Sequence, residues 1–322
     1  MMPSARLLIL LTFALAAGAA AAQGTAYVSS EKDDALTMID AQTLAVKGTV
    51  PTCKRGRHIQ RLPDGKLMVA CTDSNAADVI DPATGKSVRR VPLGEQPEAF
   101  DVSPDGKTIY VSNEDEAETS FVDAASGKVL EKIKVGQEPE GVKVSADGKT
   151  LYVTSEVASM VHVIDVASAK VTKNVKVGKR PRRMAITPDG KELWVTNELS
   201  GTVSIVDTAK HTVKATVEFK IKGMRKSDIT PVGVVMTQDG KTAWVTLGKA
   251  NHVAEVDVAT REVRRTVLAG KRAWGLALSP DDKTLFVTNG LSDDMTLVST
   301  ADGKALRTVP AGRVPHTPLV AP

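Results

Sequence analysis

The sequence predicts an all-β fold, a closed seven-bladed β-propeller of four-stranded antiparallel blades. A tight turn with the letters Asp-Gly-Lys, once Asp-Asp-Lys, recurs with its first Asp at residues 64, 105, 147, 189, 239 and 281. Successive turns are 41 or 42 residues apart, except for a single spacing of 50. A second marker, of the type VIDVAS, occurs seven times between residues 36 and 303. Seven units with a period near 42 and no helical connections are typical of propeller blades.

Residues 1–22 have the layout of a secretory signal peptide. Arg6 gives a positive start, residues 7–15 are apolar, and residues 20–22 form a small-residue cleavage site. The apolar run is too short to cross a bilayer, and no later segment reaches the roughly 20 apolar residues of a membrane helix. We therefore expect an exported, periplasmic protein whose single propeller domain spans residues 23–322.

Each unit is expected to contain four short strands. In the unit that starts at Gly141 they are residues 141–145, 150–154, 161–165 and 171–177. These runs are rich in Val, Ile, Thr and Tyr, and Gly, Asp and Ser bound them. No segment between them is long enough, or periodic enough at 3.6 residues, to be a crossover helix.

The two ends of the domain are expected to pair and close the ring. Residues 26–30 match the second strand of a unit, whereas residues 312–322 match a first strand. Pairing of these segments would complete one blade and remove two exposed sheet edges.

The stretch 103–116 contains two patterns that resemble chemical sites. Gly106, Lys107 and Thr108 resemble the end of a phosphate-binding loop, but the upstream Gly and the following helix of such a loop are missing. Asp-Gly supplies the positive φ that a tight hairpin demands, so we interpret the pattern as a turn. Residues 113–116, Asn-Glu-Asp-Glu, recur only loosely and are interpreted as a solvated loop. The Asp that ends each third strand, such as Asp123, is expected to cap the next turn.

Composition bounds the partners of the protein. The formal net charge of +4 is too small to indicate nucleic acid or an anionic membrane, and an aromatic content of 3% disfavours base stacking. Cys53 and Cys71 are the two cysteines of the chain. Both are expected near the same face of one blade, where they either form a disulfide or stay reduced.

The loops that enter each first strand carry the candidate site. Alignment of the units places one residue of each in an equivalent ring around one mouth of the central channel. We call these seven positions the inner ring: Arg57, Glu98, Glu140, Arg182, Val232, Trp274 and His316. Their identities vary from blade to blade, so the fold does not dictate them. The neighbouring candidates are His58, Arg183, Arg272 and Arg313.

Three interpretations of this ring remain open. Arg57 with Glu98, and Glu140 with Arg182, can form structural ion pairs between adjacent blades. Alternatively, the arginines bind an anionic ligand and Trp274 stacks on a planar one. A metal site built from glutamates and histidines is the third alternative, although cation sites want more oxygen donors.

The spacing of 50 marks an insertion of eight residues around residues 219–231. It is expected beside the same mouth, either as a tolerated surface loop or as a basic lid or partner contact.

The segments LYVTSE (151–156) and LWVTNE (193–198) resemble the YVTN family of seven-bladed propellers. Together with AYVSSEKDD (26–34) and VTNGLSDD (287–294), they look most like periplasmic propellers associated with PQQ-dependent alcohol catabolism. The resemblance covers essentially the whole mature chain.

This resemblance implies a non-enzymatic binding or scaffold protein that serves PQQ-linked oxidation. PQQ, another small anion or a periplasmic protein would then bind at the channel mouth. No G-x-S-x-G or H-E-x-x-H motif marks a catalytic site. The alternatives are a metal-dependent lactonase-like hydrolase, through Glu98, Glu140 and His316, and a DNA-binding propeller.

Overall fold

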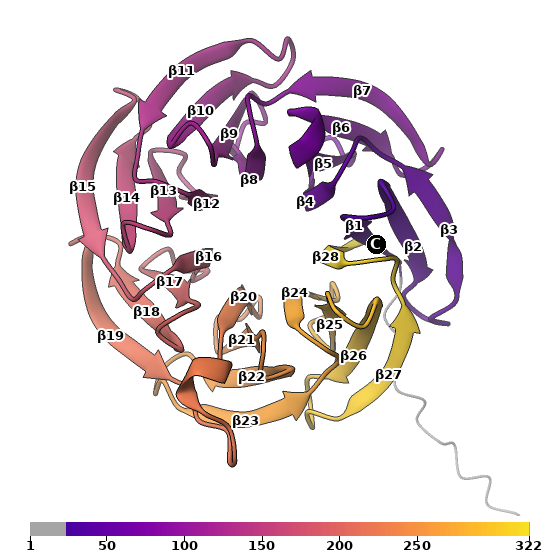
Figure 1. Cartoon of the computed structure of the whole chain (residues 1–322). Coiled ribbons are helices and arrows are strands. Elements are labelled where there is room, and N and C mark those ends of the chain that lie inside the picture. The colour runs from indigo at the N-terminus through magenta and orange to yellow at the C-terminus, as the bar shows by residue number, and fades with distance from the viewer. Residues whose placement is uncertain (1–23, 322) are drawn as a thin grey trace, which may run out of the picture.

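The computed structural model describes residues 24–321 and confirms a ring of seven four-stranded sheets (Figure 1). The predicted signal peptide, residues 1–22, lies outside the described residues. We number the blades 1 to 7 in chain order; blade 1 holds β28, β1, β2 and β3, and each later blade holds four consecutive strands. In each blade one strand lines the centre of the ring and three follow outward.

The strands of blades 1 to 3 are β1 (Thr25–Ser30), β2 (Ala35–Asp40), β3 (Val46–Pro51), β4 (Gly56–Arg61), β5 (Leu67–Cys71), β6 (Ala76–Asp81), β7 (Lys86–Pro92), β8 (Pro97–Val102), β9 (Thr108–Asn113), β10 (Glu118–Asp123) and β11 (Val129–Lys134). Those of blades 4 and 5 are β12 (Pro139–Val144), β13 (Thr150–Ser155), β14 (Met160–Asp165), β15 (Lys170–Lys176), β16 (Pro181–Ile186), β17 (Glu192–Asn197), β18 (Thr202–Asp207) and β19 (Thr212–Glu218). The remaining strands are β20 (Pro231–Met236), β21 (Thr242–Leu247), β22 (His252–Asp257), β23 (Val263–Leu268), β24 (Ala273–Leu278), β25 (Thr284–Asn289), β26 (Asp294–Ser299), β27 (Ala305–Pro310) and β28 (Pro315–Ala321).

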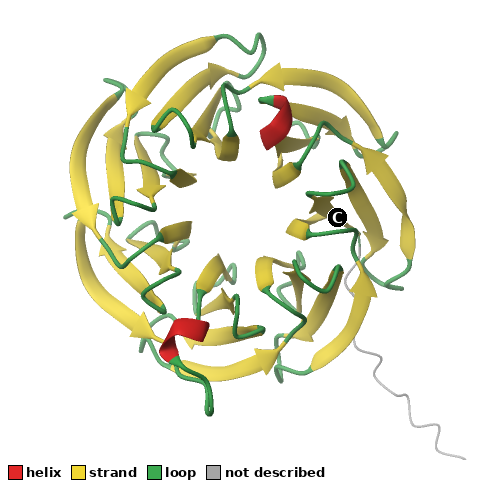
Figure 2. Cartoon of the chain, viewed as in Figure 1, coloured by secondary structure: helices red, strands yellow, loops and turns green. Residues whose placement is uncertain are grey.

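Helix among the described residues is confined to two short 3-10 turns, η1 (Thr72–Ser74) and η2 (Lys226–Asp228), as Figure 2 shows. The strands predicted for the unit that starts at Gly141 agree with β12 to β15 to within two residues at every end. No helix among residues 24–321 is long and apolar enough to cross a membrane.

The predicted closure is confirmed. β28 pairs antiparallel with β1, with Thr25 opposite Ala321 and Tyr27 opposite Leu319. The last segment of the chain therefore becomes the innermost strand of blade 1, and the pairing joins the two ends of the domain.

The recurrent turn is a hairpin turn, as predicted. Gly106 has a φ of 73°, its N–H donates to the carbonyl of Ser103, and the Asp105 carboxylate accepts the N–H of Lys107 at 3.0 Å. The cap at the end of the third strand is also confirmed, because Asp123 accepts the N–H of Ser126 at 2.7 Å. Local turn chemistry accounts for both motifs.

A hydroxyl on the second strand joins most blades to the next one. Each innermost strand has a register shift near its start, and this shift leaves a backbone N–H unpaired in the sheet. In blade 4, Thr154 Oγ1 accepts such an N–H from Gly141 at 2.7 Å and donates to the carbonyl of Arg182 in blade 5 at 2.8 Å. Equivalent hydroxyls donate to the carbonyls of other inner-ring residues, with O···O distances of 2.5–2.8 Å: Ser29 to Arg57, Ser112 to Glu140, Thr196 to Val232, Thr246 to Trp274 and Thr288 to His316.

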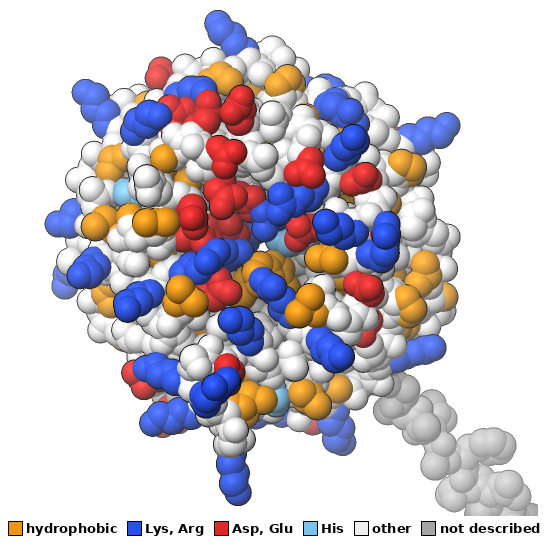
Figure 3. All heavy atoms as spheres, viewed as in Figure 1, with side chains coloured by type: hydrophobic (Ala, Val, Ile, Leu, Met, Phe, Trp, Pro, Cys, Tyr) orange, Lys and Arg blue, Asp and Glu red, His pale blue; other side chains and the backbone are white. Residues whose placement is uncertain are grey.

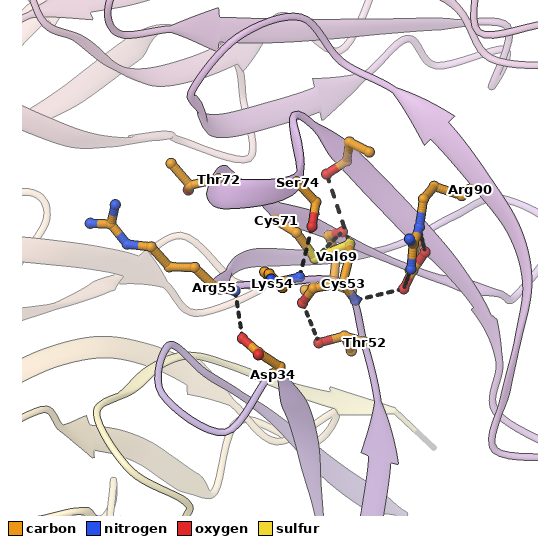
Figure 4. Close-up of a disulfide and its surroundings, with 12 residues drawn as sticks. Asp34, Thr52, Cys53, Lys54, Arg55, Val69, Cys71, Thr72, Ser74 and Arg90 are labelled. Carbon is orange, nitrogen blue, oxygen red and sulfur yellow. Dashed lines mark hydrogen bonds and ion pairs between the residues drawn. A yellow bond between two sulfur atoms is a disulfide. The ribbon is translucent and has the colours of Figure 1, made fainter.

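Blade 2 uses a disulfide in place of a polar contact. Cys53, in the loop before β4, is bonded to Cys71 at the end of β5, with the two Cα atoms 5.6 Å apart (Figure 4). At the equivalent place in blade 3, the Asn113 amide donates to the carbonyls of Leu93 and Glu95. The disulfide, one of the two outcomes that the sequence left open, therefore fixes the loop that leads to Arg57.

The insertion lies in the loop between β19 and β20, at the outer edge of the ring in Figure 1 and not beside the mouth as predicted, and it is anchored at both ends. Phe219 and Ile229 are buried in the core between blades 5 and 6. Between them, Arg225 forms an ion pair with Asp228 at 2.8 Å.

Candidate functional site

The inner ring is assembled as the sequence predicts. Its seven residues occupy the second position of the seven innermost strands, and all are buried. Figure 3 shows that acidic and basic side chains gather side by side at the centre of this face. The arrangement follows from the fold, because the equivalent position of every blade points to the same mouth.

The predicted ion pairs are present, and they extend into a network. Arg57 contacts Glu98, and Arg182 Nη2 lies 3.3 Å from Glu140 Oε1. Arg183 Nη2 lies 3.1 Å from the same oxygen. Glu140 is therefore held by two guanidiniums, whereas Glu98 is contacted by one.

A second set of acidic residues, which the sequence interpretation missed, surrounds this ring. We call Glu31, Glu114, Glu156 and Glu198 the outer acidic arc. Arg182 contacts Glu156, and Arg180 Nε lies 2.7 Å from Glu156 and 3.2 Å from Glu198. The solvated-loop interpretation is wrong for Asn113, which is fully buried, whereas Glu114 is half-buried and lines the mouth. The available signal was a Glu that recurs at one register in SSE, SNE, TSE and TNE.

The backbone holds the arc and the arginines in place. Arg180 has a left-handed φ of 55°, and its carbonyl accepts the N–H of Glu198 at 2.9 Å. Arg55 and Arg272 have the same conformation at the equivalent place. Non-glycine residues in this region are strained and often mark functional loops.

Burial and charge separate the two inner-ring glutamates. Burial, together with the neighbouring Glu140 carboxylate, raises the pKa of Glu98 to about 8, despite the attraction of Arg57. Glu140 is equally buried, but Arg182 and Arg183 lower its pKa to about 2. Two close carboxylates cannot both ionise freely, so the pair keeps its proton on Glu98.

The two histidines of the mouth are neutral at physiological pH. Burial lowers the pKa of His58 to about 3, and burial with Arg57 and Arg183 nearby holds the pKa of His316 well below its usual range. Nδ1 of His316 is 2.8 Å from the Thr317 hydroxyl, while its buried Nε2 has no hydrogen-bond partner among residues 24–321. That nitrogen is free to bond to a ligand.

Trp274 lies against two cations. The guanidinium carbons of Arg272 and Arg182 are 4.4 and 5.0 Å from the centre of its ring. A planar ligand could stack on Trp274 only if one of these groups moved. Arg313 is not part of the site, because it is two-thirds exposed and pairs with Asp33 at 2.5 Å. Arg313 does not line the mouth cavity.

The channel has three parts. The mouth cavity, of about 580 Å³, is bounded by Glu31, Glu114 and Glu198 of the outer acidic arc together with Arg57, Glu98, Trp274 and His316. A waist of about 130 Å³ follows, where His58, Arg183 and His316 meet. Beyond it, on the side of the Asp-Gly-Lys turns, a lower chamber of about 780 Å³ begins at His58 and Arg183. Residues of the mouth and of the chamber thus meet at the waist.

The side chains present do not fit a metal site. Among residues 24–321 no three His, Cys, Asp or Glu side chains are grouped so that they could hold a metal ion. Glu98 and Glu140 are both in contact with arginines, which a metal ion would have to displace. We therefore derive no metal-dependent step.

Two family models of β-propellers match parts of the chain. A family model described as "Lactonase, 7-bladed beta-propeller" matches residues 167–318, a little under half of the chain. A model of YNCE-like β-propellers matches residues 137–185. The Lactonase match includes Arg182, Arg183, Trp274 and His316. No curated protein matches the chain in sequence.

Solved structures share the fold at low sequence identity. The Pseudomonas aeruginosa periplasmic gluconolactonase PpgL is 20% identical, with a TM-score of 0.78 over 92% of this chain and 99% of its own. A protein from Kuenenia stuttgartiensis titled hydrazine synthase is 22% identical, with a TM-score of 0.77 over 90% of this chain and 99% of its own. Dihydro-heme d1 dehydrogenase NirN is 15% identical, with a TM-score of 0.70 over 92% and 75%. These similarities support the fold.

The Lactonase match corrects the functional prediction. It contradicts the expectation of a non-enzymatic binding or scaffold protein serving PQQ-linked oxidation, and it favours the hydrolase named as an alternative. Binding of PQQ at the mouth stays a prediction. The chain is a seven-bladed propeller whose second half is lactonase-like.

Proposed function

We propose that this protein hydrolyses lactones at the channel mouth, with Glu98 as the group that transfers the proton. The observation that carries the proposal is the pKa of about 8 of Glu98 in a cavity lined by arginines. A general base works best when its pKa lies near the working pH. The Lactonase match over residues 167–318 supports the same reaction class.

The reaction follows from the chemistry of the cluster. The Glu98 carboxylate takes a proton from a water molecule as that water attacks the lactone carbonyl carbon. The oxyanion that forms on the carbonyl oxygen is stabilised by a guanidinium. When the ring C–O bond breaks, the proton passes from Glu98 to the ring oxygen, and a hydroxy acid results.

Individual residues have separate roles in this proposal. Arg57 forms an ion pair with the buried Glu98. We infer that the Arg57 guanidinium moves to the lactone carbonyl oxygen when substrate binds. His316 Nε2 offers a neutral hydrogen-bonding atom to a substrate hydroxyl. The hydroxy acid product carries a carboxylate, which the arginines of the mouth can bind through charge-assisted hydrogen bonds. Such a product is a small anionic ligand of the kind that the sequence predicts.

Compartment and substrate belong to the same proposal. The leader-like residues 1–22 favour export to the periplasm. PpgL is described by its title as a periplasmic gluconolactonase. We therefore choose a sugar lactone, glucono-δ-lactone, as the first substrate to test.

The test is proton release from glucono-δ-lactone, followed in a pH-stat and corrected for spontaneous hydrolysis. The wild-type chain is expected to accelerate the reaction, and Glu98→Gln to lose at least about a hundredfold of kcat. Glu131→Gln, an exposed change on β11, is the matched control and is expected to leave the rate unchanged. A rate equal to the spontaneous one across several sugar lactones, or full activity of Glu98→Gln, would refute the proposal.

A further inference from the structure

The lower chamber is a second cavity of ligand size. Its volume of about 780 Å³ falls within the range of small-molecule sites. It lies on the opposite side of the waist from the inner ring and is lined by the later residues of the innermost strands. Apart from His58 and Arg183 at the waist, no residue of the lower chamber takes part in the proposed lactone site.

The wall of this chamber is divided by polarity. The fifth residues of β4, β8 and β12 are Gln60, Asp101 and Lys143. The fifth residues of β20, β24 and β28 are Val235, Ala277 and Leu319, and all three are only half-buried. All six line the cavity. One side of the chamber is therefore polar and the other apolar, at the same depth of the channel.

The carboxylate of Asp101 is fully engaged by the protein. It lies 3.0 Å from Lys143 Nζ, and it accepts hydrogen bonds from Gln60 Nε2 at 3.0 Å and from the Val144 N–H at 2.9 Å. Asp282, the other carboxylate of the chamber, accepts the N–H of Gln238 at 2.7 Å. The Asp101 carboxylate is therefore not left to attract a cation, while Asp282 keeps one oxygen without a hydrogen bond in the described part of the chain.

Positive groups are left with free donors. The ammonium of Lys143 has three N–H donors, and Asp101 is its one ion-pair partner among residues 24–321. Its side chain is 38% exposed. Arg61, at the outer end of β4, lines the chamber and has no ion-pair partner in the described part of the chain. An anion therefore finds donors on the polar side.

We propose that the lower chamber binds a small amphipathic anion, independently of lactone hydrolysis at the mouth. Its charged head pairs with the ammonium of Lys143, which Asp101 holds in place. Its apolar body lies against Val235, Ala277 and Leu319, where it removes half-exposed apolar surface from water. A ligand that lacks either part loses one of these two contributions.

Isothermal titration calorimetry with octanoate tests this proposal, with acetate and octylammonium as probes that lack the tail or the negative charge. Octanoate is expected to bind, and the other two probes at least about tenfold more weakly. Octylammonium cannot form the charge-assisted hydrogen bond with Lys143, and acetate lacks the apolar chain that covers the apolar wall. Lys143→Gln is expected to weaken octanoate binding by about tenfold. Lys176→Gln, an exposed change at the end of the outermost strand β15 of the same blade, is the matched control and is expected to have no effect.

Two further variants locate the site. Ala277→Gln places a polar side chain on the apolar wall and is expected to weaken octanoate binding without shifting the melting temperature. Glu98→Gln, a mouth variant, is expected to bind octanoate like the wild type. Equal binding of octylammonium, unchanged binding to Lys143→Gln and Ala277→Gln, loss of binding in Glu98→Gln, or no octanoate binding at all would each overturn the proposal.

Discussion

At the scale of single residues, Glu98 and Glu140 show how neighbours set the chemistry of identical side chains. Both occupy the second position of an innermost strand, and both are buried. Arg182 and Arg183 lie within 3.3 Å of Glu140, whereas Arg57 is the one ion-pair partner of Glu98 among residues 24–321. Burial disfavours the charged form of each, so the carboxylate with fewer cations keeps the proton.

This assignment predicts an unusual effect of pH on stability. The pKa of Glu98 rises from 4.5 to about 8 on folding, so the folded protein binds this proton more tightly than the unfolded chain does. The resulting stabilisation of the fold is complete at pH values below the unfolded pKa of 4.5. That stability is lost as pH rises towards the folded pKa, by at most about 1.4 kcal/mol per pH unit. Glu98→Gln removes the ionisation, so its free energy of unfolding relative to the wild type should increase between pH 5 and pH 8.

Urea unfolding of both proteins across this pH range measures the difference. Glu131→Gln, which changes an exposed carboxylate on β11, is the control for a generic loss of charge. A constant difference between wild type and Glu98→Gln from pH 5 to pH 8 would show that the pKa of Glu98 is not raised.

The sequence predicted some of these residues and not others, for physical reasons. Unit alignment placed the inner ring and paired Arg57 with Glu98, because register fixes where a strand residue lies. It missed the role of Glu156 and misplaced Arg313, because loop backbone and side-chain direction depend on contacts that register does not fix. The pKa of Glu98 depends on burial and on how many arginines reach each carboxylate, which no spacing shows.

At the scale of elements, a hydroxyl between blades positions the site. Thr154 accepts the N–H that the irregular start of β12 leaves free, and it donates to the carbonyl of Arg182 on β16. Gly141 on β12 shows how close these strands lie, because a Cβ there would be 2.3 Å from the carbonyl of Arg182. The inner ring is thus held by backbone contacts between blades, not by its own ion pairs alone.

Thr154→Val should be destabilising because it leaves the Gly141 N–H and the Arg182 carbonyl buried without their partner. We expect a loss of about 2 kcal/mol in the free energy of unfolding. Thr154→Ser keeps the hydroxyl, as Ser112 does in blade 3, and should retain most of the stability. Urea denaturation of the three proteins is the measurement, and equal stability of the Val and Ser variants would contradict this role.

At the scale of the whole molecule, the repeat and its closure determine the fold, and the chain breaks the symmetry for function. The Asp-Gly-Lys turns, mostly 41 or 42 residues apart, together with seven copies of the second marker sufficed to predict seven blades, because each unit must stack on its neighbours to bury its faces. The channel, in contrast, is asymmetric at two depths. Blades 2 to 5 supply Arg57, Glu98, Glu140 and Arg182, while blades 6, 7 and 1 supply the uncharged side of the inner ring. The lower chamber repeats this division with a polar and an apolar wall.

The disulfide cross-links the loop before β4 to the end of β5 in blade 2. It closes a segment with a sequence separation of 18 residues, which corresponds to about 3 kcal/mol of stabilisation. The Cys53→Ser, Cys71→Ser double variant should therefore unfold at a lower urea concentration than the oxidised wild type. Reductant should lower the wild-type midpoint and leave that of the double variant unchanged. Identical midpoints for the oxidised wild type and the double variant would exclude a stabilising role.

The pH dependence of kcat/KM for lactone hydrolysis tests the central claim most directly. This ratio reports ionisations of the free enzyme, so it should rise with pH through a pKa near 8, where Glu98 loses its proton. Burial also raises the pKa of Glu156 to about 8, so Glu156→Gln must be measured beside Glu98→Gln. We predict that Glu156→Gln keeps the rising limb and that Glu98→Gln loses it together with the activity. A rising limb that survives in Glu98→Gln, or a wild-type rate no faster than spontaneous hydrolysis at any pH, would contradict the account.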